Sequence, residues 1–430
     1  MTGQSKLLPG LGPVRKLSGE PSICLLCRGS KLLCGKPACP ALMRANSIAR
    51  LNLTRSSLEV EGSSPPSVFV GRMGYPRVSI GPMVPPLSGD TSHMNDPSLW
   101  YRMQISEFVQ MITSLFRGTF PATVNKPEEG GRLLQELQEL ALSSRSPDTD
   151  VIFSRPLSAG ISLSSDVQPF GPSAPLSKMQ VSGTRSNLKL ERAFYDEDLK
   201  AADAMWNIYR SGEPVQSIQR VLSLAMLGVA NNRRLVPTRW SITAVDDTLG
   251  KRLRDRVIRY EQLGEFRLHY SRSMGNLYAV LLVPGFWSYE LMEIFHSGSV
   301  WNPSGGEVAI AGDCEGTKER SSYASIGGCY YSARLAVLEH LDAIRKCATV
   351  IVIREALPSY LLPVGVWTVR EGIRDAMRSK PQTFSDMKSS LSALSELTKA
   401  SMAIIIEESS LLRRMIYQSR LTRFLMGDSS

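Results

Sequence analysis

Long apolar runs are missing from this sequence. Its most apolar segments, LYAVLLVPGFW and ATVIVIREAL, are too short to span a bilayer, and the first residues contain no apolar stretch of signal-peptide length. We therefore expect a cytoplasmic protein without a membrane partner. Blocks of like charge are missing as well, so the charge of the chain lies on folded surface and not in a charged tail.

Motifs of the common nucleotide-binding and hydrolytic enzymes are also missing. Neither GxGxxG nor GxxxxGK followed by Ser or Thr occurs, so nucleotide binding has no support in the sequence. No serine or cysteine nucleophile motif is present. Only 4 histidines occur, and none shows the spacing of metal ligands. Whether the protein is an enzyme is therefore left open.

The composition is that of a globular protein with a basic excess. The chain has 430 residues, of which 43% are hydrophobic and 21% charged, enough for two or three domains with cores of their own. Lys and Arg number 50 against 40 for Asp and Glu, which gives a net charge of +10 at pH 7. A positive net charge of this size favours a polyanionic partner.

Helical and extended patterns follow one another without a regular βαβ rhythm. A helix over 243–260 is expected to begin with Thr243 or Asp246 as its N-cap. Two strands joined at Met-Gly-Asn are expected within 265–285, and one long helix or two over 385–417. Further helices are predicted over 128–144, 196–214, 214–228, 330–346 and 366–379, and strands over 307–315 and 347–355. The predicted fold class is α+β, in a mixed multi-domain protein.

Changes of composition along the chain suggest its domain organisation. A small cysteine-containing module is expected near the N-terminus, two α+β domains in the middle, and a helical tail at the end. The predicted bounds are 1–20 for a flexible N-terminus, 21–50 for the cysteine module, 51–275 and 276–400 for the two domains, and 401–430 for the tail.

Four of the seven cysteines lie in one short stretch, CLLCRGSKLLCGKPACP. Two pairs of thiolates, Cys24 with Cys27 and Cys34 with Cys39, can complete the tetrahedron that a structural zinc ion requires. Glycine and proline between them supply the tight backbone. Because all four ligands are protein side chains, such a metal would be structural. An iron–sulfur cluster is the alternative, since four thiolates also suit one.

The stretch RRLVPTRWSITAVDD gathers side chains that suit a nucleic acid. Arginine can hold a phosphate and tryptophan can stack on a base, and two adjacent carboxylates can hold a divalent cation for catalysis. A structural role is the alternative, with the carboxylates in the first turn of a helix. The DNA-contact candidates are Arg233, Arg234, Arg239 and Trp240, and the catalytic candidates are Asp246 and Asp247.

A second stretch, GGCYYSARLAVLEHL, opens a predicted helix behind a glycine pair. Gly327 and Gly328 would let backbone amides approach a phosphate, with Arg334 close behind them in the sequence. A plain turn before a core helix explains the same residues. Arg334 is therefore a further candidate for contact with DNA.

Together, three central stretches and the two ends of the chain resemble the archaeal Nre family of DNA repair proteins. They are NKPEEGGRLLQELQELALSSR, RRLVPTRWSITAVDD and GGCYYSARLAVLEHL, with the four-cysteine motif before them and QSRLTRFL after them. The resemblance implies a role in DNA damage repair, a zinc-finger-like N-terminus and recruitment by the replication sliding clamp (PCNA). Association with the chromosome follows, and other repair proteins are further candidate partners.

The C-terminal sequence fits the motif by which proteins bind that clamp. The pattern requires Gln, an aliphatic residue three positions later, and two large apolar residues at its end. Gln418, Leu421, Phe424 and Leu425 occupy these positions. In a 3₁₀ turn, residues three apart project together, so Leu421 and Phe424 would enter one pocket. Leu425 departs from the commoner aromatic residue but stays apolar. A helix end packed on its own domain is the alternative.

The resemblance leaves three functional hypotheses open. The first is a clamp-recruited repair factor whose basic body meets DNA. The second is a repair enzyme, a nuclease or a base-removing activity, that uses Asp246 and Asp247 with a divalent cation. The third is an adaptor that joins the clamp to other repair proteins without touching DNA.

We predict that the full chain binds a single zinc ion through the four-cysteine motif. Cys27→Ser should lose the metal and make the N-terminal segment sensitive to protease, because a module this small needs its metal to fold. Elemental analysis and limited proteolysis measure both effects, with Cys314→Ser, outside the motif, as the control. A metal-free protein with a protease-resistant N-terminus would contradict the zinc assignment.

Overall fold

A computed structural model describes residues 27, 31–51, 58–157, 169–303 and 306–425. The chain divides into two compact units. The N-terminal unit comprises Pro40–Arg252, and the C-terminal unit comprises Leu253–Ser430 with the segment up to Cys39. Each unit combines helices with one mixed six-stranded sheet, which confirms the predicted α+β class. No helix of the described residues is long and apolar enough to cross a membrane.

The sheet of the N-terminal unit has the strand order β1-β5-β6-β4-β3-β2. β4 and β6 are parallel and the other neighbours antiparallel. Along β4, buried residues alternate with more exposed ones, as expected for a sheet with one face on the core. The strands are β1 (Glu59–Ser63), β2 (Val68–Val70), β3 (Arg77–Val84), β4 (Phe116–Thr123), β5 (Asp148–Phe153) and β6 (Ser173–Ser182).

Helices of this unit confirm the periodicity found in the sequence at α5, α7 and α8. The last helix of the unit, α9, begins at Thr238, upstream of the predicted caps Thr243 and Asp246. Pro237 ends the preceding segment, and its carbonyl accepts the N–H groups of Trp240 and Ser241. The helices are α2 (Pro40–Ala49), α3 (Pro97–Trp100), α4 (Ile105–Thr113), α5 (Gly131–Leu142), α6 (Leu188–Tyr195), α7 (Ala201–Arg210), α8 (Val215–Ser223) and α9 (Thr238–Val257), with 3₁₀ turns η1 (Ser92–Asn95), η2 (Pro127–Gly130) and η3 (Ala230–Asn232).

The sheet of the C-terminal unit has the order β10-β9-β11-β8-β7-β12, with β9 and β11 parallel and the rest antiparallel. The predicted hairpin is confirmed between β7 and β8. Met274 and Gly275 turn it with φ values of 48° and 76°, the left-handed conformation that two-residue hairpin loops require. The strands are β7 (Phe266–Ser273), β8 (Asn276–Val283), β9 (Ser288–Phe295), β10 (Ala309–Glu315), β11 (Thr349–Ala356) and β12 (Gln382–Phe384).

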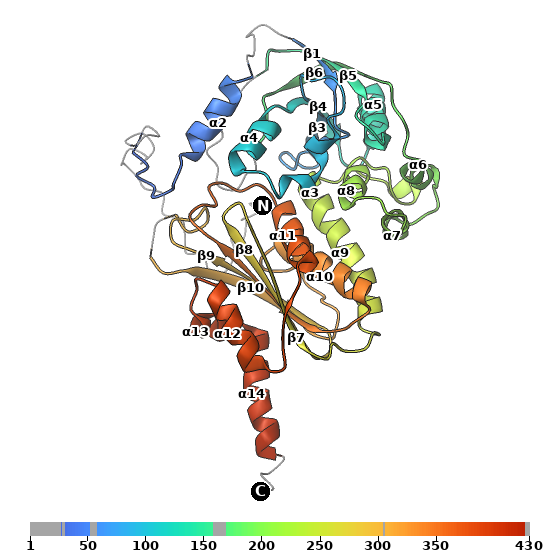
Figure 1. Cartoon of the computed structure of the whole chain (residues 1–430). Helices are drawn as coiled ribbons and strands as arrows, with labels where there is room; N and C mark the ends of the chain where they lie inside the picture. Colours follow the sequence, from blue (N-terminus) through green and yellow to red (C-terminus); the bar gives the residue numbers. More distant parts are fainter. Residues whose placement is uncertain (1–26, 28–30, 52–57, 158–168, 304–305, 426–430) are drawn as a thin grey trace, which may run out of the picture. The chain divides into compact units, whose positions relative to one another are not determined.

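Helices cover both faces of this sheet (Figure 1). On one face α10 (Gly328–Ile344) and α11 (Trp367–Arg378) pack together, and Tyr278 of β8 lies against Gly372 of α11. The other face carries α12 (Met387–Leu397), α13 (Met402–Glu408) and α14 (Ser410–Leu425), whose Leu394, Ile405 and Leu411 join the strand residues Leu281 and Ile353 in one core. Because side chains alternate between the two faces of the sheet, β8 and β11 contribute residues to two separate cores.

The C-terminal region forms three helices where the sequence predicted one or two. Two buried carboxylates of the sheet account for the interruptions. Glu355 of β11 accepts the N–H groups of Lys399 and Ala400 at 3.0 and 2.8 Å, between α12 and α13. Glu290 of β9 accepts those of Ser410 and Leu411 at 2.7 and 3.1 Å, at the start of α14. A carboxylate at a helix N-terminus satisfies otherwise unpaired amides and complements the helix dipole.

We predict that Glu290 holds α14 on the sheet. Glu290→Ala leaves the first amides of α14 without an acceptor in a buried place, so the free energy of unfolding should fall by about 1.5–3 kcal/mol. Glu408→Ala, which removes an exposed carboxylate from α13, should change the free energy of unfolding by less than about 0.5 kcal/mol. Urea unfolding of both variants measures the difference. Equal free energies of unfolding for Glu290→Ala and Glu408→Ala would contradict the role of Glu290.

Candidate functional site: an exposed aromatic pair and a buried ionic cluster

Two large aromatic side chains meet on the surface of the N-terminal unit. The rings of Tyr75 and Trp240 lie 5.4 Å apart between centroids, and the side chains are 51% and 45% exposed. Tyr75 belongs to the turn between β2 and β3, and Trp240 to the first turn of α9. Thr238 fixes these segments together, because its hydroxyl accepts the N–H of Val70 at 2.8 Å. An exposed pair of this size suits a binding surface.

The two segments that carry the pair also carry arginines without carboxylate partners among the described residues. Arg72 lies in the same turn as Tyr75, and Arg239 precedes Trp240 in the first turn of α9; both are exposed. Their guanidinium groups make no hydrogen bond or ion pair with any residue that the structure describes. The first turn of α9 contains no acidic residue. A cation at a helix N-terminus opposes the helix dipole, so Arg239 costs stability unless an anion binds beside it.

The other two arginines of this stretch have local partners. Arg233 donates to the carbonyls of Gly228 and Asp196 at 2.8 and 3.0 Å and lies over the ring of Phe194. Partial burial lowers the pKa of Arg233. Arg234 donates to Asn125 at 2.8 Å on the surface. Arg233 therefore stabilises its own loop. Arg239, whose guanidinium has no partner among the described residues, is the arginine best placed to bind a ligand.

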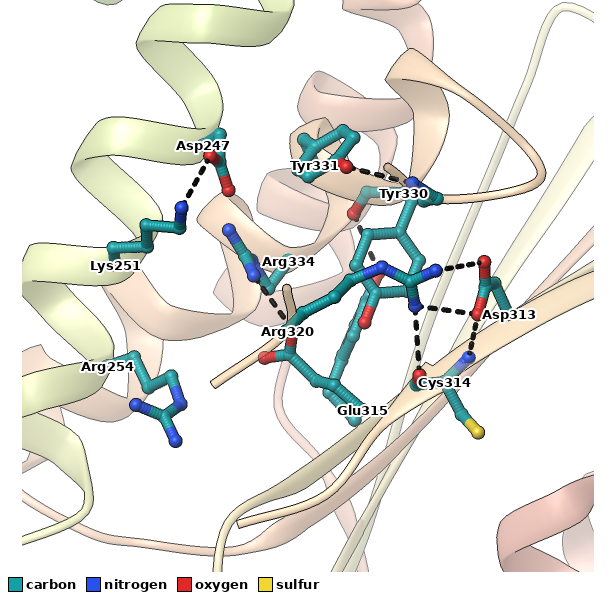
Figure 2. Close-up of polar contacts among 12 residues, drawn as sticks. Asp247, Lys251, Arg254, Asp313, Cys314, Glu315, Arg320, Tyr330, Tyr331 and Arg334 are labelled. Atoms are coloured by element: carbon teal, nitrogen blue, oxygen red, sulfur yellow. Dashed lines mark hydrogen bonds and ion pairs between the residues drawn. The ribbon is translucent and has the colours of Figure 1, made fainter. Parts of the chain in front are cut away.

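The two candidate catalytic carboxylates lie in the middle of α9 and in different surroundings. Asp246 is fully buried and accepts a hydrogen bond from Gln219 at 3.1 Å. Asp247 pairs with Lys251 one turn later at 3.1 Å (Figure 2). Their expected place in a first turn is wrong, because α9 begins earlier. No group of three or more metal-ligating side chains occurs among the residues that the structure describes.

Arg334, a candidate for DNA contact, lies inside the C-terminal unit. Its guanidinium is 1% exposed and pairs with Glu315 of β10 at 2.8 Å (Figure 2). Trp287 donates to the other oxygen of Glu315 at 3.2 Å, and the ring of Tyr331 lies 5.5 Å from the guanidinium. Arg334 therefore joins the start of α10 to the sheet and does not face solvent.

A second ion pair orders the loop before α10. Arg320 donates to both carboxylate oxygens of Asp313 at 2.7 and 2.8 Å, and the N–H of Ser325 donates to the same group at 2.7 Å. Burial alone would raise the pKa of Asp313, but the hydrogen bonds from Arg320 and Ser325 outweigh it and hold that pKa below its usual value. The loop delivers Gly327, with φ of 69°, to the start of α10.

A third ionic group, which the sequence analysis did not identify, lies between β9 and β11. Arg354 and Glu293 are direct partners in the parallel register and pair at 2.5 Å, and Arg354 also donates to Asn276 at 3.0 Å. All three side chains are buried. The signal in the sequence was a charged residue within an otherwise apolar strand, which requires a buried partner.

Of the four cysteines, Cys24 lies outside the described residues. Cys27 is buried, Cys34 and Cys39 are half-buried, and none of the three forms a disulfide with a described residue. Gly35 follows Cys34 with φ of 70° and donates to the carbonyl of Leu32, which gives the tight turn expected there. The described cysteines are not gathered into a metal-binding group. The structure thus does not show the zinc knuckle, which remains a prediction.

The proposed clamp motif lies at the end of α14. Gln418, Leu421, Phe424 and Leu425 occupy the last turns of this helix, whose backbone is described to Leu425. Within the C-terminal unit, α14 runs away from the sheet toward the C-terminus (Figure 1). In its first turns Leu411 and Leu412 are buried, whereas Tyr417 is 58% exposed.

Fold and surface thus define a two-unit α+β protein with a basic aromatic surface. Comparison with known proteins gives its family. The model "Archaeal Nre, N-terminal" matches residues 33–302 and "Archaeal Nre, C-terminal" matches residues 315–424. The chain belongs to the archaeal Nre family, as its sequence motifs indicated. No solved structure matches it.

Curated relatives agree with this assignment. The chain is 38% identical to DNA repair protein NreB of Archaeoglobus fulgidus over 91% of its own length and 97% of the relative's. It is 35% identical to DNA repair protein NreA of the same organism over 86% and 93%. Identity to DNA repair protein NreA of Haloferax volcanii is 37% over 76% and 80%. A role in DNA repair is therefore supported across nearly the whole chain.

Two arginines should respond oppositely to truncation. Arg334→Ala leaves the carboxylate of Glu315 buried and unpaired, so the free energy of unfolding should fall by about 3–5 kcal/mol. Arg239→Ala removes an exposed side chain that has no partner among the described residues, and should change the free energy of unfolding by less than about 0.5 kcal/mol. Chemical unfolding of both variants separates the structural arginine from the surface one. A stable Arg334→Ala protein would contradict the interior role of that residue.

Proposed function

We propose that this protein is a DNA damage repair factor that the replication sliding clamp recruits through the C-terminal motif, and that its N-terminal unit contacts DNA. The single observation that supports DNA contact best is the exposed Tyr75–Trp240 pair beside Arg239. The DNA repair role itself rests on the family and on the names of its members.

Clamp recruitment is supported by the order and spacing of the four motif residues at the end of α14. Burial of the apolar side chains of Leu421, Phe424 and Leu425 would contribute about 1.5–3 kcal/mol each. Ordering of the segment on the partner offsets several kcal/mol of this gain, so we expect micromolar affinity. A protein recruited in this way is cytoplasmic and associated with the chromosome.

We further propose that the four N-terminal cysteines bind Zn²⁺ as a structural ion. The support is their number within one short stretch and the tight turn at Gly35. The enzymatic alternative would depend on Asp246 and Asp247, of which the first is buried against Gln219 and the second paired with Lys251. No contact of the described residues favours that alternative over DNA binding.

Phe424→Ala tests clamp recruitment. Loss of the largest apolar side chain of the motif should weaken binding to the sliding clamp by about 2–4 kcal/mol, as for a central aromatic anchor. Tyr417→Ala, on the same helix but outside the motif, is the matched control and should bind the clamp like the wild type. Calorimetric titration into the clamp measures both affinities.

Thermal melts of the same proteins complete the test. The melting temperature of Phe424→Ala should equal that of the wild type if the motif serves a partner. Unchanged clamp affinity together with a lowered melting temperature would show that Phe424 packs on the protein itself, and clamp recruitment through this motif would then be wrong.

A further inference from the structure

We infer that the Tyr75–Trp240 pair binds unpaired bases, so that the DNA held at this surface is single-stranded. This inference rests on the proposed function and specifies the form of DNA that the N-terminal unit takes. It concerns a surface built from two segments that are far apart in the sequence. Of the two rings of the pair, the sequence analysis identified Trp240 but not Tyr75.

The first argument is the availability of aromatic faces. The rings of Tyr75 and Trp240 are inclined by 52°, so they are not stacked face to face on one another. Each side chain remains about half exposed. Met73, in the same turn as Tyr75, is 81% exposed and adds a polarisable apolar side chain. These side chains therefore leave apolar surface that the described residues of the N-terminal unit do not cover.

The second argument is that the site is fixed before any ligand binds. Thr238 accepts the N–H of Val70, which ties the start of α9 to the edge strand β2. The backbone N–H of Gly71 donates to the carbonyl of Ser79. The backbone N–H of Arg77 donates to the carbonyl of Gly74 at 3.0 Å, which closes the turn that carries Tyr75. A preorganised pair of rings loses little conformational entropy on binding, so more of the stacking energy appears as affinity.

The third argument is charge. Arg72 and Arg239 come from the same two segments as the rings, and neither guanidinium is engaged by a described residue. The helix dipole of α9 adds positive potential where Arg239 lies. Phosphates spaced along a strand can meet these groups while the bases between them reach the rings. Charge complementarity therefore favours a nucleic acid over an apolar segment of a protein.

Duplex DNA does not fit these features as well. Inside a duplex each base is stacked on its neighbours, and its face is closed to a side chain. Only an unpaired or extruded base offers the face that an aromatic ring needs. The arginines alone would bind duplex and single strand alike through phosphates. The rings thus predict a preference for single-stranded DNA that the arginines do not.

The experiment measures binding of the full chain to a labelled oligonucleotide by fluorescence anisotropy, first as a single strand and then as its duplex. Trp240→Ala and Tyr75→Ala should each weaken single-strand binding about tenfold or more and leave duplex binding nearly unchanged. Trp240→Phe should restore most of the affinity because it keeps an aromatic face. Tyr195→Ala, which removes another exposed ring of the same unit, is the matched control and should have no effect.

Salt dependence separates rings from charges. Arg239→Ala should weaken binding to both forms of DNA. It should also reduce the slope of log affinity against log salt by about the amount expected for one phosphate contact. The ring variants should keep the wild-type slope, because they remove no charge. Melting temperatures of all variants should match the wild type, since the changed side chains are exposed.

The outcomes distinguish the inference from the proposed function. The inference would be overturned if the wild type binds DNA and Trp240→Ala does not change that binding. It would also be overturned if Trp240→Ala weakens binding to duplex and single strand equally. Either result would leave the role in DNA repair intact. Absence of binding to any DNA would overturn DNA contact as a whole. Loss of clamp binding in Trp240→Ala would show that the pair is a protein-docking surface and would overturn the inference as well.

Discussion

Buried carboxylates that accept hydrogen bonds from other elements hold the C-terminal unit together. Glu290, Glu293, Glu315 and Glu355 are each less than 10% exposed, and each lies on a strand of the sheet. A buried carboxylate costs several kcal/mol unless hydrogen bonds and opposite charges offset its lost hydration. In this unit the offset comes from other elements: amides at the start of α14 for Glu290, amides between α12 and α13 for Glu355, and arginines for Glu293 and Glu315.

This arrangement determines where the functional segments leave the body. Glu290 fixes the start of α14, and therefore the point from which the proposed clamp motif extends. Glu315 and Asp313 fix the start of α10 through Arg334 and Arg320. The residues of the proposed motif lie in the last turns of α14, after the buried Leu411 and Leu412.

Elements whose pattern is local could be predicted from the sequence. The β7–β8 hairpin follows from Met-Gly-Asn between two apolar runs, and α10 and β11 from their periodicity. The three-helix division of the C-terminal region could not be predicted, since the interruptions depend on Glu290 and Glu355, which lie far upstream. The start of α9 was misplaced because Thr243 and Asp246 resemble caps, whereas Pro237 starts the helix earlier.

The candidate site shows the same division. Arg239 and Trp240 were found from residue type alone, because an arginine beside a tryptophan suits a nucleic acid. Tyr75 and Arg72 were missed, since only the fold brings the β2–β3 turn to the start of α9. Arg334 looked equivalent to Arg239 in the sequence, and burial against Glu315 separates the two. The sequence shows which side chains are suited to a role, and the fold shows which are free to perform it.

The central claim is that one chain holds the clamp through its tail and DNA through its N-terminal unit. The most direct measurement is the affinity of the full-length protein for a clamp loaded on gapped DNA, compared with clamp alone and gapped DNA alone. Two linked contacts should raise the affinity about 10²–10⁴-fold above the stronger single contact. An affinity for the loaded clamp no tighter than for either component alone would contradict the account.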